Sequence, residues 1–126
     1  MAKFSDSALL KTKSRESIYM DLFSGYGQPS TTSIHLKNAQ GQEEELMSFD
    51  GNVENAEIGA VRKLKYNKIE IRTIIHDVHD NPIEKVDISL NVRVYDADSN
   101  EVETNFSMKT LGMGTIFYSD FHVTIL

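Results

Sequence analysis

The sequence predicts an all-β protein, an antiparallel β-sandwich or a partly open barrel of about seven or eight strands. The strongest observation is the strict alternation of apolar and polar residues from Val86 to Met108, on both sides of a short polar turn. This alternation is typical of a β-hairpin with one buried and one solvent-exposed face. Further alternating segments, separated by turn-forming residues, favour a sandwich over an α/β fold.

Length and composition indicate one domain that folds without covalent cross-links. The chain has 126 residues, enough to bury roughly two-thirds of the surface of its unfolded form. Cysteine is absent, which excludes disulfides, a thiol nucleophile and a cysteine-ligated metal. We expect an N-terminal arm or short helix over residues 1–16, followed by a single β-sandwich domain over residues 17–126.

Each predicted strand shows alternation and is bounded by turn formers. Before the hairpin, the predicted strands are residues 18–23, 33–37, 45–49 and 64–78, and the last strand is 116–126. Residues 53–60 are polar and acidic and predict a loop, and Asn81-Pro82 predicts a corner. The apolar side of these strands predicts the buried core, which includes Ile71, Ile88, Leu90, Val92, Val94, Phe106 and Phe121.

The turn from Asp96 to Asn100 imitates the start of a calcium-binding loop, with oxygen-bearing side chains at its first, third and fifth positions. The sixth position requires glycine and holds Glu101, and the twelfth requires a bidentate glutamate and holds Ser107. The residues instead predict a hairpin turn whose Asp and Asn side chains bond to their own backbone.

One segment carries the side-chain types of a metal site. His76, His79 and Asp80 are ligands that zinc, nickel or iron accept. Positions three apart in a strand point to opposite faces, so the two histidines could meet only if the chain turns between them. We expect no metal and no other cofactor, and a metal-dependent enzyme at His76 and His79 remains the third functional hypothesis.

The net charge of −6 is concentrated in one segment, residues 41–57, which contains acidic residues and no basic ones. A basic segment follows at residues 62–72. These segments are either solvated surfaces or complementary patches that orient neighbouring copies. For the second case, the expected interface residues are Glu43, Glu44, Glu45, Arg62, Lys63 and Lys65, together with the strand that ends at Leu126.

The tyrosines provide the remaining indication of function. Five tyrosines lie at strand ends or opposite apolar faces, where tyrosine commonly seals the edge of a core: Tyr19, Tyr26, Tyr66, Tyr95 and Tyr118. Several tyrosines on one sheet face would form a platform for a small molecule or glycan, which is the second functional hypothesis. The acidic charge and the shortness of the basic segment argue against nucleic acid.

The first functional hypothesis is a non-enzymatic structural subunit of a larger assembly, such as a virion or a phage-tail-like particle. It would contact protein partners, including its own copies, through edge strands and charged patches. The N-terminal residues contain no apolar segment typical of a signal peptide, and no apolar run approaches the ~18 residues of a membrane span. We therefore expect a soluble protein of the cytoplasm, without membrane contact.

Overall fold

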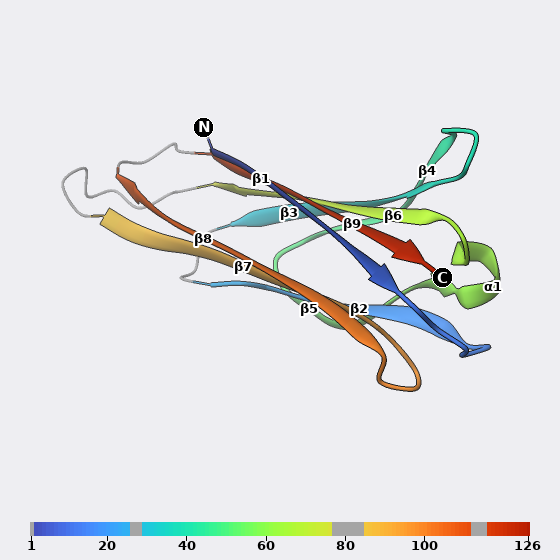
Figure 1. The fold of residues 1–126 in the computed structure, drawn as a ribbon. Helices are drawn as coiled ribbons and strands as arrows, with labels where there is room; N and C mark the ends of the chain where they lie inside the picture. The colour runs from blue at the N-terminus through green and yellow to red at the C-terminus, as the bar shows by residue number, and fades with distance from the viewer. Residues whose placement is uncertain (1, 26–28, 77–84, 112–115) are drawn as a thin grey trace.

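Two β-sheets pack face to face across an apolar core in the computed structural model, which describes residues 2–25, 29–76, 85–111 and 116–126 (Figure 1). The elements are β1 (Ala2–Leu10), β2 (Ser17–Ser24), β3 (Ser30–Lys37), β4 (Glu43–Asp50), β5 (Val53–Ala60), α1 (Val61–Leu64), β6 (Lys68–His76), β7 (Lys85–Asp96), β8 (Glu101–Leu111) and β9 (Ile116–Ile125). The first sheet has the strand order β1-β9-β6-β3-β4, and the second has the order β5-β2-β7-β8. The predicted all-β sandwich is confirmed.

The β7–β8 hairpin is the most regular part of the second sheet. Its strands pair in one unbroken register from Lys85 opposite Leu111 to Tyr95 opposite Glu101. Along each strand, every second side chain points toward the first sheet. Leu90 and Phe106 both point this way and lie opposite each other across the hairpin, within the core. All seven residues that the sequence assigns to the core are buried.

The N-terminal segment forms a strand rather than a free arm or a helix. β1 runs parallel to β9, with Ala2 opposite Phe117 and Leu10 opposite Ile125. Phe4 packs against the rings of Phe106 and Phe117, with ring centroids 5.7 and 4.7 Å apart, respectively. β1 therefore forms one edge of the first sheet and spans the side of the sandwich next to β8.

Two further segments differ from the prediction. The expected loop over residues 53–60 is β5, whose pairing with β2 shifts register twice, so that the alternation visible in a regular strand is lost. The strand expected from residue 64 begins only at Lys68, because residues 61–64 form the helical turn α1 with Val61 and Leu64 buried.

The strand that ends at Leu126 is not a sheet edge, contrary to our expectation. β9 lies between β1 and β6. The backbone N–H of Leu126 donates a hydrogen bond to the carbonyl of Leu10, and the carbonyl of Leu126 accepts one from the backbone N–H of Thr12. Both hydrogen bonds are 2.8 Å long. Within the described residues, no helix is both long and apolar enough to span a membrane.

Candidate functional site

The four edge strands of the sandwich differ in regularity. The edges are β1 and β4 in the first sheet and β5 and β8 in the second. β4 begins with three exposed glutamates, and its register against β3 shifts between Ile34 and His35. β5 has the two register shifts described above, and Asn55 adopts a positive φ of 54°. Charges and bulges of this kind hinder an edge from pairing with another strand.

β1 and β8 are long and regular by comparison. Neither pairing, β1 with β9 or β8 with β7, shifts register, and neither strand contains proline. The two strands lie on the same side of the sandwich, where Thr104 Oγ1 of β8 donates a hydrogen bond to Asp6 Oδ2 of β1 at 2.7 Å. This side therefore presents two strand edges of the kind that can accept a further strand.

The expected interface charges partly pair with one another inside the chain. Lys63 Nζ lies 3.1 Å from Glu44 Oε1, and Arg72 Nη2 lies 2.6 Å from Glu43 Oε1. The acidic and basic segments thus partly neutralise each other within one chain, and their role in contacts between copies stays a prediction. Glu45 and Arg62 are exposed, whereas Lys65 donates from Nζ to the carbonyl of Thr12 at 3.2 Å.

The expected metal residues near residue 76 are only partly described. His76 is exposed at the end of β6, and its backbone N–H donates to the carbonyl of Pro29 at 3.0 Å. His79 and Asp80 lie outside the described residues. The metal site at His76 and His79 stays a hypothesis.

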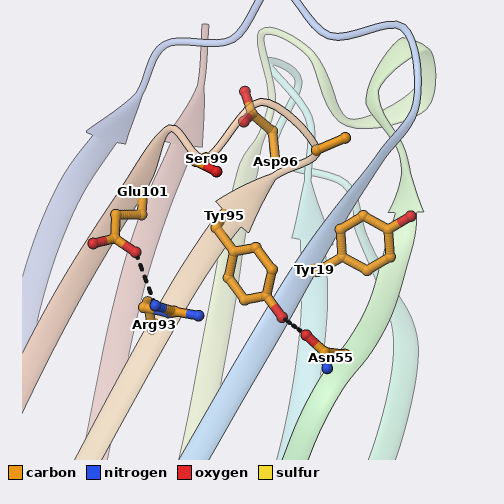
Figure 2. A pocket seen from close by; sticks show the side chains of 8 residues that line it. Tyr19, Asn55, Arg93, Tyr95, Asp96, Ser99 and Glu101 are labelled. Carbon is orange, nitrogen blue, oxygen red and sulfur yellow. Dashed lines mark hydrogen bonds and ion pairs between the residues drawn. The ribbon is translucent and has the colours of Figure 1, made fainter.

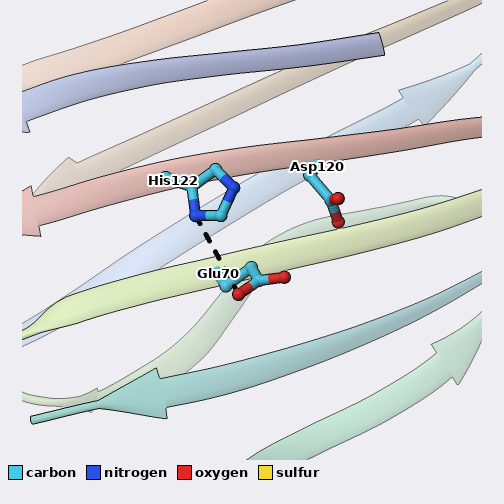
Figure 3. Close-up of side chains that lie close together, drawn as sticks. All are labelled: Glu70, Asp120 and His122. Carbon is cyan, nitrogen blue, oxygen red and sulfur yellow. Dashed lines mark ion pairs between the residues drawn. The ribbon is translucent and has the colours of Figure 1, made fainter. Parts of the chain in front are cut away.

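A second group of possible metal ligands lies on the outer face of the first sheet and was missed in the sequence. Glu70, Asp120 and His122 each offer one ligand atom, and these atoms lie within 4.8 Å of one another (Figure 3). Glu70 stands between His35 and His122 in the cross-strand register. No pattern within one segment could reveal a group that sheet order brings together from separate strands.

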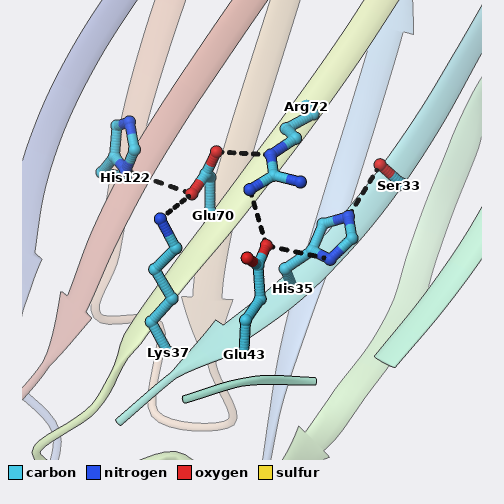
Figure 4. Close-up of polar contacts among 7 residues, drawn as sticks. All are labelled: Ser33, His35, Lys37, Glu43, Glu70, Arg72 and His122. Atoms are coloured by element: carbon cyan, nitrogen blue, oxygen red, sulfur yellow. Dashed lines mark hydrogen bonds and ion pairs between the residues drawn. The ribbon is translucent and has the colours of Figure 1, made fainter. Parts of the chain in front are cut away.

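Both oxygens of Glu70 are already paired with cations (Figure 4). Arg72 Nε lies 2.5 Å from Oε1, and Lys37 Nζ lies 3.0 Å from Oε2. Burial alone would raise the pKa of Glu70, but hydrogen bonds and charge attraction from Arg72 and Lys37 lower it to about 2. A metal ion would have to displace these cations, so the network favours a structural ion-pair cluster over a metal centre.

A pocket with an aromatic floor lies over the second sheet, near the β7–β8 turn. Tyr19 of β2 and Tyr95 of β7 are cross-strand partners, with ring centroids 5.9 Å apart and ring planes inclined by 24°. Figure 2 shows the two rings next to each other with their faces in open view. The Arg93 guanidinium carbon lies 4.6 Å from the centroid of the Tyr95 ring.

Asp21 holds the polar groups beside this floor. Its carboxylate accepts hydrogen bonds from the backbone N–H of Asn55 at 2.7 Å, from the Tyr95 hydroxyl at 2.9 Å and from Arg93 Nη2 at 2.9 Å. Burial opposes ionisation, but these donors together lower the pKa of Asp21 below its usual value. Burial and the bond to Asp21 raise the pKa of Tyr95, so its hydroxyl stays protonated.

The pocket has a volume of about 500 Å³. Its lining residues are Tyr19, Asn55, Arg93, Tyr95, Asp96, Ala97, Ser99 and Glu101. The β7–β8 turn forms one wall, and Glu101 Oε2 at the start of β8 lies 3.2 Å from Arg93 Nη1. The sequence indicates the tyrosines as candidates but not their pairing, because the register of β2 against β7 is a property of the fold.

No protein-family model matches the chain, and comparisons with curated proteins and with solved structures yield no match either.

Proposed function

We propose that the protein is a non-enzymatic interaction subunit of a larger protein assembly and that it contacts its neighbours at the β1 and β8 edges. The observation that supports this proposal is the difference between the edges. The pairings of β4 and β5 shift register, and such bulges hinder strand addition, whereas β1 and β8 are regular over their whole paired length. Strand addition at an open edge forms backbone hydrogen bonds without requiring a deep pocket.

The charges of β8 support pairing with a second copy of the same strand. Glu103 and Lys109 are exposed and stand at equal distances before and after Phe106. In an antiparallel pair of β8 strands related by a twofold axis at Phe106, Glu103 would lie opposite Lys109 of the second copy. Lys109 would likewise lie opposite Glu103 of the second copy. Opposite charges in such cross-strand positions stabilise the pair.

This arrangement would join the two β5-β2-β7-β8 sheets into one continuous sheet. The β1 edge would then remain available to a different neighbour. A subunit with two usable edges can belong to an assembly larger than a dimer, which is the role that we infer.

The experiment is a charge exchange across the proposed β8 pair, with molar mass measured by light scattering over a range of protein concentrations. Lys109→Glu would place two acidic residues opposite each other and weaken association. The double variant Glu103→Lys with Lys109→Glu would restore it, because the charges are opposite again. Glu45→Lys on the β4 edge is the matched control and would leave association unchanged.

Salt provides an independent measure, because screening acts over about 8 Å at physiological ionic strength. Added salt should weaken association of the wild-type protein more than that of a variant with both charges replaced by Gln. A wild-type protein that is monomeric at every concentration would contradict the proposal. Equal association of the wild-type protein and of Lys109→Glu would contradict the β8 pairing.

A further inference from the structure

We propose that the pocket over Tyr19 and Tyr95 binds a neutral, polyhydroxylated ligand of the oligosaccharide class. The site lies on the outer face of the second sheet and is distinct from the edges on which the assembly proposal depends. Three features of the described residues carry the proposal: the aromatic floor, the polar groups around it and the sign of the local charge.

The floor fits the apolar face of a sugar ring. A pyranose presents C–H groups on its faces and hydroxyl groups around its rim. The near-parallel rings of Tyr19 and Tyr95 have their centroids 5.9 Å apart, and Figure 2 shows their faces in open view. They offer a flat apolar surface on which the C–H groups of a sugar ring can pack.

The groups around the floor can bond to hydroxyls. The pocket lining includes the amide of Asn55, the guanidinium of Arg93, the hydroxyl of Ser99 and the carboxylate of Glu101. Together these groups include hydrogen-bond donors and acceptors, and a sugar hydroxyl can serve as either. Apolar floors with a few polar groups at their margin are typical of small-ligand sites.

The charge of the site favours a neutral ligand over an anionic one. Arg93 is paired with two carboxylates, those of Asp21 and Glu101, at 2.9 and 3.2 Å. One cation between two anions leaves the site with excess negative charge, and the carboxylate of Asp96 in the lining adds to it. A phosphate or another anion would be repelled, so a nucleotide fits this site poorly.

The site is organised before any ligand arrives. The Asp21 carboxylate accepts hydrogen bonds from the backbone N–H of Asn55 and from the guanidinium of Arg93. The Tyr95 hydroxyl, which has one proton to donate, lies within hydrogen-bonding distance of both Asp21 Oδ1 and Asn55 Oδ1. Asn55 has a positive φ of 54°, within the irregular pairing of β5 with β2, and this brings it next to Asp21. Side chains that are already held in place lose little conformational freedom on binding, which favours affinity.

The test is calorimetric titration with four neutral probes: cellohexaose, chitohexaose, maltohexaose and mannohexaose. We expect at least one probe to bind the wild-type protein and to bind Tyr19→Ala about tenfold more weakly or not at all. Tyr19→Phe keeps the ring and would retain binding. Tyr118→Ala, on the outer face of the first sheet, is the matched control and would bind as the wild-type protein does.

Glu101→Gln provides a second variant, because Glu101 is exposed and its replacement leaves the core intact. We expect it to weaken binding of the same probe, since Glu101 would lose its charge-assisted hydrogen bond to a hydroxyl. Failure of all four probes to bind would overturn the proposal. The proposal would also be overturned if Tyr19→Ala bound the oligosaccharide as the wild-type protein does. It would be overturned as well if the pocket over Tyr19 and Tyr95 bound ATP more tightly than any of the oligosaccharides.

Discussion

Thr12 Oγ1 donates a hydrogen bond to Asp96 Oδ2 at 2.5 Å, and this bond joins the connection between β1 and β2 to the β7–β8 turn. Both residues are buried. Oδ1 of Asp96 also accepts the backbone N–H groups of Asp98 and Asn100, each at 2.9 Å. The predicted turn, in which an Asp side chain bonds to its own backbone, is therefore present and is tied to a distant segment.

Replacement of Asp96 should destabilise the fold. Burial alone would raise the pKa of Asp96, but the donors on Thr12, Asn100 and Asp98 together lower it. Asp96→Ala leaves these donors without their acceptor, which costs about 1–3 kcal/mol for each group that remains buried and unpaired. Urea unfolding measures the loss, with the exposed Asp98→Ala as control. Equal stability of the two variants would show that the turn does not depend on Asp96.

Core packing predicts a larger loss at Leu90. Its side chain is 1 % exposed and faces Phe106 of β8. Leu90→Ala should lower the free energy of unfolding by about 2–5 kcal/mol, because it removes buried apolar atoms and leaves a cavity. Leu9→Ala is the matched control, since Leu9 is 60 % exposed and the same atoms are removed from a solvated site. Similar losses in both variants would contradict the assigned core.

The sequence predicts the parts of this fold in which local pattern and burial agree. The β7–β8 hairpin has unbroken alternation, and its predicted core residues are buried. β1 was missed as a strand because Asp6 interrupts the apolar series of Phe4, Ala8 and Leu10 on its inner side. Asp6 is tolerated there because Thr104 of β8 donates to it, a contact that only the assembled sandwich supplies.

The candidate site is less predictable because it depends on strand order. Tyr19 and Tyr95 become neighbours only when β2 pairs with β7 in the observed register. Asn55 comes next to them from β5, whose bulges erase the alternation of a strand. Glu70 was likewise missed, since its partners Lys37 and His122 come from β3 and β9.

Zinc should not stabilise the protein. Glu70, Asp120 and His122 are close enough to share an ion, but Lys37 and Arg72 pair with both oxygens of Glu70. A ligand that binds only the folded state raises the melting temperature, so the absence of binding leaves it unchanged. Thermal unfolding with and without equimolar zinc measures the change in melting temperature. A rise that His122→Ala abolishes would instead establish a metal site in this cluster.

The Glu70 network should make stability depend on pH in the acidic range. The pKa of Glu70 falls from its usual value of 4.5 to about 2 in the folded protein. The unfolded chain therefore takes up a proton before the folded chain does as the pH falls. The stabilisation is complete above about pH 5 and is lost as the pH falls toward 2; a pKa difference of this size corresponds to about 3 kcal/mol.

Glu70→Gln tests this dependence because it keeps the shape of the side chain and removes its charge. At about pH 7 the variant should be less stable than the wild-type protein, since Lys37 loses its ion pair with Glu70 and Arg72 keeps only its pair with Glu43. The difference should narrow steadily as the pH is lowered through the range from about 4.5 to about 2, where the wild-type carboxylate becomes protonated as well. Urea unfolding at several pH values measures it, and Glu54→Gln, at an exposed position of β5 in the other sheet, corrects for general effects of acid. A difference that stays constant down to about pH 2 would show that the charge of Glu70 does not stabilise the fold.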